Sequence, residues 1–361
     1  MFIENKNYKE GWSNLFDIET KSNEIILQAH KVCASDVHIV PTSCYSIIEY
    51  RIDNQLLTIE EIRNNEAEKI ISHLKFRSKM DIGERRKPQS GSLKMKIKKD
   101  KLNIRLSTLP TTPHESLSIR LLPQNEVETL HRLTLFPKHT AQLSSLIKKA
   151  HGLVIVSGPT GSGKTTTIYS LLNEAAARKK RIVCIEDPIE KRTDKFIQVE
   201  INEKAGLTYA HTLKAVLRHD PDIIMIGEIR DVETATVAIR AAMTGHLVIS
   251  TIHAKNCLGS IARLKELGIK EHDINETVIG LVSQRLLEMK CSICGNTCSK
   301  YCRTYRKRRR LAVFEILADQ SLQRLLTKCK TNIGYGSLEQ AIKKSFALGY
   351  VNEEEYERWL C

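Results

Sequence analysis

The feature that most constrains the fold of this chain is a glycine-rich loop that follows an apolar run. The loop reads Gly158-Pro159-Thr160-Gly161-Ser162-Gly163-Lys164-Thr165 and fits the pattern G-x-x-x-x-G-K-[ST]. Before it, Leu153–Val156 predicts a buried strand. Glycines let backbone N–H groups point at a phosphate, and a helix that begins at the lysine adds a favourable dipole. Lys164 would neutralise the β- and γ-phosphate oxygens, and the Thr165 hydroxyl would hold Mg²⁺, so we predict a nucleoside triphosphate site.

Two further apolar runs end in carboxylates. Residues 222–228 predict a strand that ends at Glu228, and we expect this strand to lie beside that of the glycine-rich loop and to deliver its acid to the Mg²⁺ shell. Residues 182–185 predict another strand, followed by Glu186, Asp187 and Glu190. Because three acids would repel a bound polyanion, one of them is predicted to position or deprotonate the attacking water. The alternative is a helix cap with a proline-initiated turn.

A histidine follows a fourth apolar run. His253 comes directly after the strand predicted at 247–251. The carboxyl ends of parallel strands meet at one edge of a sheet, so we expect His253 at the same edge as the other motifs. There its imidazole would donate a hydrogen bond to the γ-phosphate and report its loss; the alternative is a histidine with a structural role.

The order of the predicted elements indicates two domains. Apolar strands rich in Val and Ile that alternate with helical segments predict an α/β fold with a doubly wound parallel sheet at 138–361. A smaller α+β domain is predicted at 1–122, and 123–137 reads as a linker. In the small domain, helices are expected at 17–34 and 60–79, and strands at 37–40, 47–52, 93–97, 102–107 and 116–122.

Composition limits the partners. The formal net charge of +14 favours acidic partners such as nucleic acid, an anionic membrane surface or an acidic protein face. No apolar run approaches the roughly 18 residues that span a bilayer, and the polar N-terminus does not read as a signal peptide. We therefore expect a cytoplasmic protein whose contact with the inner face of the membrane is peripheral.

Four cysteines are crowded near the end of the predicted α/β domain. They are Cys291, Cys294, Cys298 and Cys302. Four thiolates suit tetrahedral Zn²⁺, so one interpretation is a structural zinc site. The other is four reduced thiols at packing or surface positions.

Taken in order, these motifs resemble those of the secretion or traffic ATPases of type II secretion and type IV pilus systems, which are hexameric RecA-like motors. The resemblance continues in the small domain, in Ala34-Ser-Asp-Val-His-Ile39, in residues 81–91 and in residues 105–110. It covers roughly residues 22–290 and implies a RecA-like P-loop domain after a PAS-like N-terminal domain, with ATP and Mg²⁺ as ligands.

The resemblance also implies roles for individual residues. Glu190 matches the water-activating glutamate, Glu228 the Walker B acid near Mg²⁺, and His253 the γ-phosphate sensor. Arg105 and Arg120 match arginines of the N-terminal domain that complete the active sites. Glu186 belongs to the aspartate box and is expected, with the glycine-rich loop, in the nucleotide site.

The chain departs from the family pattern at two places. The family loop Pro-Gln-Asp-Gly-Arg is Pro88-Gln-Ser-Gly-Ser92 here, so one family arginine is missing. The sequence also begins almost at the second N-terminal domain, as in the competence pseudopilus ATPases of Gram-positive bacteria and the pilus retraction ATPases. Assembly-type members carry two separated CxxC motifs, and the Cys cluster therefore favours assembly by analogy.

From this resemblance we expect a homohexamer that acts on a polytopic membrane platform protein and, through it, on pseudopilins. Its work would be assembly of a competence pseudopilus for DNA uptake. Pilus retraction, type II secretion and a RecA-like DNA translocase are the alternatives. Direct DNA binding is not expected, because aromatic residues are only 5% of the chain and no basic cluster is interleaved with a stacking platform.

Overall fold

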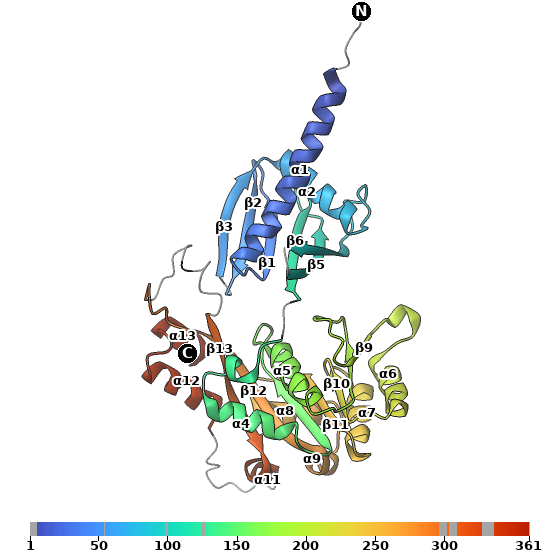
Figure 1. The fold of residues 1–361 in the computed structure, drawn as a ribbon, viewed down its shortest axis with the longest axis vertical. Helices are drawn as coiled ribbons and strands as arrows, with labels where there is room; N and C mark the ends of the chain where they lie inside the picture. Colours follow the sequence, from blue (N-terminus) through green and yellow to red (C-terminus); the bar gives the residue numbers. More distant parts are fainter. Residues whose placement is uncertain are drawn as a thin grey trace, which may run out of the picture. The chain divides into compact units, whose positions relative to one another are not determined.

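The computed structural model describes residues 6–53, 55–97, 100–124, 127–295, 302, 309–326 and 336–360. The chain divides into two compact units: Met1–Asn125 with Ile293–Lys307, and Glu126–Ser292 with Arg308–Cys361. Each unit has its own sheet and its own hydrophobic core (Figure 1). Within the described residues, none of the helices combines the length and the hydrophobicity that crossing a membrane requires.

The first unit is built on a six-stranded sheet with the order β3-β2-β1-β6-β5-β4. Every pair of neighbouring strands in it is antiparallel. Its elements are α1 (Lys6–Lys31), β1 (Asp36–Pro41), β2 (Ser46–Ile52), β3 (Gln55–Ile62), α2 (Asn64–Arg77), β4 (Gln89–Ile97), β5 (Asp100–Leu109) and β6 (Ser116–Pro123).

The alternation of side chains along a strand decides which face of this sheet is buried. In β1, Val37 and Ile39 are fully buried and join a core cluster with Ile26 of α1 and Ile70 of α2. Asp36 and its neighbours on the other side of the pleat belong to the opposite face, away from those helices. The cross-strand partners of Asp36, which are Arg51 and Arg120, share that second face.

The second unit is an α/β structure on a seven-stranded sheet with the order β13-β12-β7-β11-β10-β8-β9. Neighbouring strands are parallel, except that β12 and β13 are antiparallel. The strands are β7 (Gly152–Ser157), β8 (Ile182–Glu186), β9 (Ile197–Glu200), β10 (Ile223–Ile226), β11 (Leu247–Ile252), β12 (Val278–Glu288) and β13 (Arg310–Ala318).

Helices cover both faces of the larger sheet (Figure 1). They are α3 (Leu130–Leu133), α4 (Pro137–Leu146), α5 (Lys164–Ala176), α6 (Tyr209–Val216), α7 (Val232–Met243), α8 (Cys257–Glu266), α9 (Glu271–Thr277), α11 (Asp319–Leu326), α12 (Leu338–Ala347) and α13 (Glu353–Leu360). In β7, Leu153 and Ile155 pack with α6 to α9, whereas Val154 and Val156 pack with α4 and α5. Burial on both faces explains the uninterrupted apolar runs, and the predicted doubly wound α/β fold is confirmed.

The strand order corrects one expectation about the acidic strand. β10, which precedes Glu228, does not lie beside β7, because β11 is inserted between them. Each of these parallel strands is followed by a helix, and such a crossover can place the next strand one position further away; the strand sequences do not encode this choice. The strand of His253 is therefore the immediate neighbour of the glycine-rich loop's strand, and that of Glu228 is one further away.

Several element boundaries also differ from the prediction. The helix expected at 60–79 begins only at Asn64, because residues 55–62 continue the alternation of β2 and pair with it as β3. Strands β9, β12 and β13 were not predicted. In β12, the polar residues Gln284 and Arg285 interrupt the apolar run by which the other strands were recognised.

Candidate active site at the carboxyl edge of the larger sheet

The glycine-rich loop lies at the carboxyl end of β7 and leads directly into α5. Gly158, Gly161 and Gly163 have positive φ angles of 148°, 79° and 85°, which residues with a side chain rarely adopt. The Nζ atom of Lys164 donates to the carbonyl oxygens of Gly158 at 2.8 Å and Pro159 at 3.0 Å. An ammonium group over a loop of backbone N–H groups at a helix N-terminus is the arrangement that binds phosphate.

Strand β12 supports this loop from the side. Gln284 is buried, and its Nε2 donates to the carbonyl oxygen of Ser162 at 2.7 Å. A Cβ atom on Gly158 would come within 2.6 Å of the carbonyl oxygen of Gln284, so no other residue fits there. Arg285 donates to the carbonyl oxygens of Gln284 at 3.0 Å and Lys255 at 2.7 Å, which ties the loop's support to the segment after β11.

Glu228 and His253 face each other at the ends of β10 and β11. Oε2 of Glu228 lies 3.3 Å from Nε2 of His253, and its other oxygen contacts the guanidinium of Arg230. Thr251 Oγ1 donates to the carbonyl oxygen of Gly227 at 2.7 Å and holds the two strand ends together. The side chain of Glu228 is 13% exposed and that of His253 is 60% exposed, so the histidine faces solvent.

The pKa values of His253 and Lys164 are shifted by their surroundings at this edge. Burial lowers the pKa of His253, and the positive charges of Lys164 and Arg230 lower it further. Burial likewise lowers the pKa of Lys164, while the negative charge of Glu190 opposes that change. At neutral pH the imidazole is therefore neutral and can donate one hydrogen bond without adding a charge.

The aspartate-box acids lie in two different environments. Glu190 is exposed, and it lies close enough to Lys164 for its negative charge to oppose the lowering of the pKa of that ammonium by burial. Glu186 is only 3% exposed, and both of its oxygens lie within hydrogen-bond distance of the hydroxyl of Tyr169, at 2.7 and 2.8 Å. This location argues against the predicted role of Glu186 in holding the nucleotide or Mg²⁺, because its oxygens are already engaged below the site.

The motifs thus meet at one edge of the larger sheet. The glycine-rich loop, His253, Glu228 and Glu190 follow β7, β11, β10 and β8, which are consecutive parallel strands. The edge combines a phosphate cradle, two carboxylates and a neutral imidazole. This is the set of groups that transfer of a phosphoryl group to water requires.

The predicted arginines lie in the first unit, in one row across the second face of its sheet. Arg105 pairs with Arg120, and Arg120 pairs with Asp36 on the next strand. The Nε atom of Arg120 donates to Oδ1 of Asp36 at 2.8 Å. The row continues to Arg51 on β2, which sequence reasoning did not single out.

At its other end, the row reaches the position where the family arginine is missing. Ser92 on β4 pairs with Arg105, so the position where the family carries an arginine is directly opposite. In this chain the guanidinium groups of the row are therefore Arg51, Arg120 and Arg105. The alternation of residues 47–52 placed Arg51 in a strand, but only the register shows that it shares a row with the other two.

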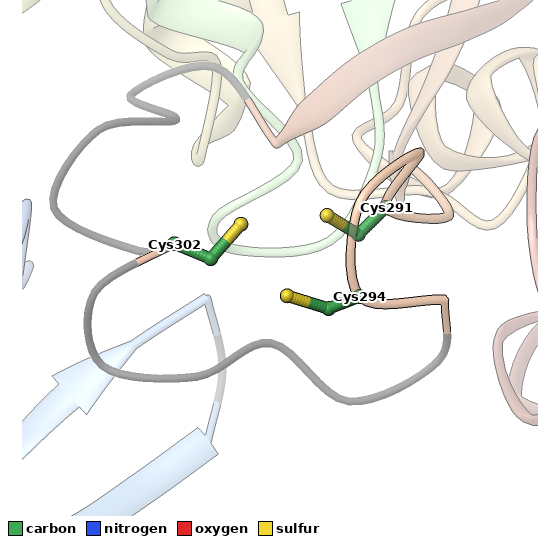
Figure 2. A group of neighbouring side chains, drawn as sticks. All are labelled: Cys291, Cys294 and Cys302. Atoms are coloured by element: carbon green, nitrogen blue, oxygen red, sulfur yellow. The ribbon is translucent and has the colours of Figure 1, made fainter.

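Three of the four clustered cysteines lie together after β12. The sulfur atoms of Cys291, Cys294 and Cys302 lie within 4.8 Å of one another, and Figure 2 shows them directed toward a common centre. Cys298 lies outside the described residues. Zn–S bonds of about 2.3 Å in a tetrahedron place sulfurs about 3.8 Å apart, so these residues fit a zinc ion.

Comparisons with known proteins agree with this geometry. Residues 14–355 match the family described as Type II/IV secretion system protein. The chain is 49% identical over 348 residues to the competence protein ComGA of Bacillus subtilis strain 168, which covers 95% of this chain and 98% of that protein. It is 38% identical over 274 residues to the type II secretion system protein E of Pectobacterium carotovorum, which covers 76% of this chain and 55% of that protein.

A solved structure gives the same result for the fold. The crystal structure of the pilus retraction motor PilT with bound ADP superposes with a TM-score of 0.66 at 26% identity. The superposition covers 93% of this chain and 96% of that one. Coverage of this extent takes in residues of both units.

Proposed function

The chain belongs to the type II/IV secretion system protein family and is an ATPase of that family, and from this premise we propose that it is a hexameric motor. Its work is assembly of a type IV-like competence pseudopilus for DNA uptake, through a polytopic membrane platform protein. The observation that carries the proposal is the juxtaposition of Lys164, Glu190, Glu228 and His253 at one sheet edge.

In the proposed reaction these residues divide the work. The glycine-rich loop and Lys164 hold the phosphates, and Thr165 with Glu228 holds Mg²⁺. Glu190 accepts a proton from the attacking water, since its carboxylate is exposed close to Lys164. His253 gives its single N–H to the γ-phosphate in place of its contact with Glu228, so that loss of the phosphate lets the contact with the end of β10 form again.

The arginine row completes the site in trans. Within the described residues, the guanidinium of Arg105 has no hydrogen-bonded or ionic partner, and that of Arg120 is 60% exposed despite its bond to Asp36. An exposed guanidinium and one without a partner both suit a polyphosphate presented from outside. We place that polyphosphate on the larger sheet of a neighbouring copy, so that hydrolysis changes how neighbours contact each other.

Competence is the end use that the relatives favour. The alignment with ComGA takes in nearly the whole of both proteins, whereas the type II secretion relative is matched over little more than half of its length. Retraction and type II secretion remain alternatives with the same chemistry. A DNA translocase is a further alternative, and stimulation of the ATPase rate by DNA at low salt would favour it.

ATPase rate measured against protein concentration and particle mass tests the motor. We expect activity only in assemblies of roughly six copies, and its loss in Glu190→Gln and Arg105→Ala at unchanged assembly. Full activity in a monomer would contradict the proposal.

The cysteine segment is proposed to hold structural zinc. Cys291, Cys294 and Cys302 supply three thiolates, and Cys298 is the fourth predicted ligand. Native mass spectrometry should find one zinc per chain, and Cys291→Ser and Cys294→Ser should lose it. The exposed Cys33 of the first unit provides the matched control, Cys33→Ser. Metal-free protein with full ATPase activity would contradict the zinc site.

A further inference from the structure

A buried cluster of hydrogen bonds lies beneath the aspartate-box loop, and the proposed reaction does not use it. Its members come from three elements: Tyr169 from α5, Glu186 from the end of β8, and Gln198 from β9. Tyr169 is 1% exposed and Glu186 is 3% exposed. Its position links the helix that begins at the glycine-rich loop to the segment that carries Glu190.

The distances show that the cluster is tightly made. The Tyr169 hydroxyl contacts both oxygens of Glu186 at 2.7 and 2.8 Å and the carbonyl oxygen of Lys191 at 3.0 Å. The Nε2 of Gln198 lies 2.8 Å from the Tyr169 hydroxyl, 2.8 Å from the carbonyl oxygen of Lys191 and 3.2 Å from Oε1 of Glu186. Every one of these contacts is within hydrogen-bond range.

The number of protons in the cluster indicates the form of Glu186. A tyrosine hydroxyl supplies one proton and a glutamine amide supplies two, which are too few for all the contacts if Glu186 is ionised. A protonated Glu186 adds a fourth proton for these six contacts, so that Glu186 can donate to Tyr169 while Tyr169 donates to the carbonyl oxygen of Lys191. Burial raises the pKa of Glu186, which agrees with this arrangement.

Both sides of Glu190 are fixed by this cluster. The backbone N–H of Glu190 donates to the Glu186 carboxyl group. The carbonyl oxygen of Lys191, the next residue, accepts from Tyr169 and Gln198. The main chain at Glu190 is therefore bonded on each side to a group that Tyr169 touches, and Tyr169 lies on the same helix as Lys164.

We propose that Tyr169 and Glu186 are positioning residues, which hold the Glu190 loop at a fixed place relative to the glycine-rich loop through hydrogen bonds and not through charge. This inference rests on the proposed role of Glu190. A displacement of about 1 Å in a reacting group costs about a hundredfold in rate. The cluster would thus set kcat without touching the nucleotide.

Tyr169→Phe removes only the hydroxyl. Its ring stays packed edge-on against Phe196, with centroids 5.6 Å apart. We expect kcat for ATP hydrolysis to fall by about ten- to a hundredfold, with KM and nucleotide affinity within about twofold of wild type. The matched control is Tyr50→Phe, since Tyr50 is also buried and its hydroxyl donates to the carbonyl oxygen of Ile25 at 2.8 Å, in the first unit.

A pair of substitutions at Glu186 separates hydrogen bonding from charge. Glu186→Gln keeps a neutral group that both donates and accepts, and should retain kcat within about threefold. Glu186→Leu has the same bulk without hydrogen bonds, and should lose kcat as Tyr169→Phe does. Binding of a fluorescent ATP analogue and the melting temperature show that each variant is folded and loaded.

Three results would overturn the proposal. One is wild-type kcat in Tyr169→Phe. Another is a loss in Glu186→Gln as large as in Glu186→Leu, which would mean that a charge at Glu186 is required. The last is an equal loss in Tyr50→Phe, which would mean a general effect of lost stability. If the wild type hydrolyses ATP and Lys164→Ala does not, the proposed function stands, and any of these three results then counts against the positioning role alone.

Discussion

The two sheets of this protein present their charged side chains in different ways. The larger, parallel sheet gathers Lys164, Glu190, Glu228 and His253 at one edge, on the segments that follow its strands. The smaller, antiparallel sheet spreads its arginines in a row across one face. In a parallel sheet the segments after the strands meet at one edge, so their charged side chains gather there. In an antiparallel sheet the register of neighbouring strands aligns charged side chains in a row across one face.

The difference separates an edge that can bind a nucleotide by itself from a row of arginines that can contact a nucleotide bound to another surface. At the parallel edge, backbone N–H groups, an ammonium and carboxylates follow strands that are buried along their length, which suits a nucleotide with its metal. On the antiparallel face, Arg120 is exposed and Asp36 balances only part of the positive charge. Such a row lacks any cradle of its own and suits an anion that is already bound elsewhere.

The largest effect is expected from Lys164→Ala. Its ammonium lies over the phosphate loop, and without it kcat/KM for ATP should fall by at least about a thousandfold. Lys149→Ala is the control, because Lys149 makes an exposed ion pair with Asp319 at 2.7 Å. Steady-state ATPase assays compare them. A modest loss in Lys164→Ala would mean that the carboxyl edge of the larger sheet is not the ATPase site, and would contradict the distinction between the two sheets.

A smaller loss is expected on the arginine row. Arg105→Ala should lower kcat by about a hundredfold, because one donor to the developing phosphate charge is lost. Arg51→Ala should lower it less, by about tenfold, since Asp36 lies between Arg51 and the rest of the row. The exposed Arg63 provides the control Arg63→Ala. Equal effects at Arg51 and Arg63 would mean that Arg51 does not contribute to hydrolysis, and that only Arg105 and Arg120 of the row do.

The smallest effect on activity is expected at a half-buried histidine that belongs to neither set of charged residues. His139 of α4 packs edge-on against Phe136 and Phe314, with centroids 5.4 and 5.7 Å away. Burial lowers the pKa of His139 to about 4 from 6.5. As the pH falls, the histidine of the unfolded chain therefore takes up its proton before that of the folded protein does. The free energy of unfolding keeps its full contribution from His139 above pH 6.5 and falls by up to about 3 kcal/mol as the pH drops toward 4.

Removing that titration tests whether His139 acts through packing alone. His139→Phe should flatten the dependence of the melting temperature on pH between 6.5 and 4 and leave kcat at pH 7.5 unchanged. Thermal melts of wild type and variant over this range make the measurement. An unchanged slope would show that another group is responsible for the acid sensitivity of the second unit.

Local patterns in the sequence predicted much of the fold. Buried runs such as 153–156 and 247–251 became strands because both faces of a parallel sheet are apolar. The order of strands was wrong where β11 enters between β7 and β10, since it depends on helix crossovers that no single segment encodes.

The site was predictable only where its residues follow a strand or loop motif. The glycine-rich loop, Glu190, Glu228 and His253 have such signals. Gln284 supports the loop from 122 residues away, and Tyr169 and Gln198 meet Glu186 from separate elements. Arg51 joins the arginine row through strand register alone. Such contacts arise from tertiary packing, so composition and spacing could not reveal them.

Mixing two inactive variants tests most directly whether the two sheets form one active site between neighbouring copies. Lys164→Ala lacks the phosphate ligand and Arg105→Ala lacks the arginine, and each should be inactive alone. In a mixed ring about one quarter of the interfaces join an intact P-loop to an intact arginine, so we expect ATPase activity to return to roughly that fraction of wild type. Mixtures that stay as inactive as the separate variants, although they form mixed assemblies, would contradict a site completed in trans.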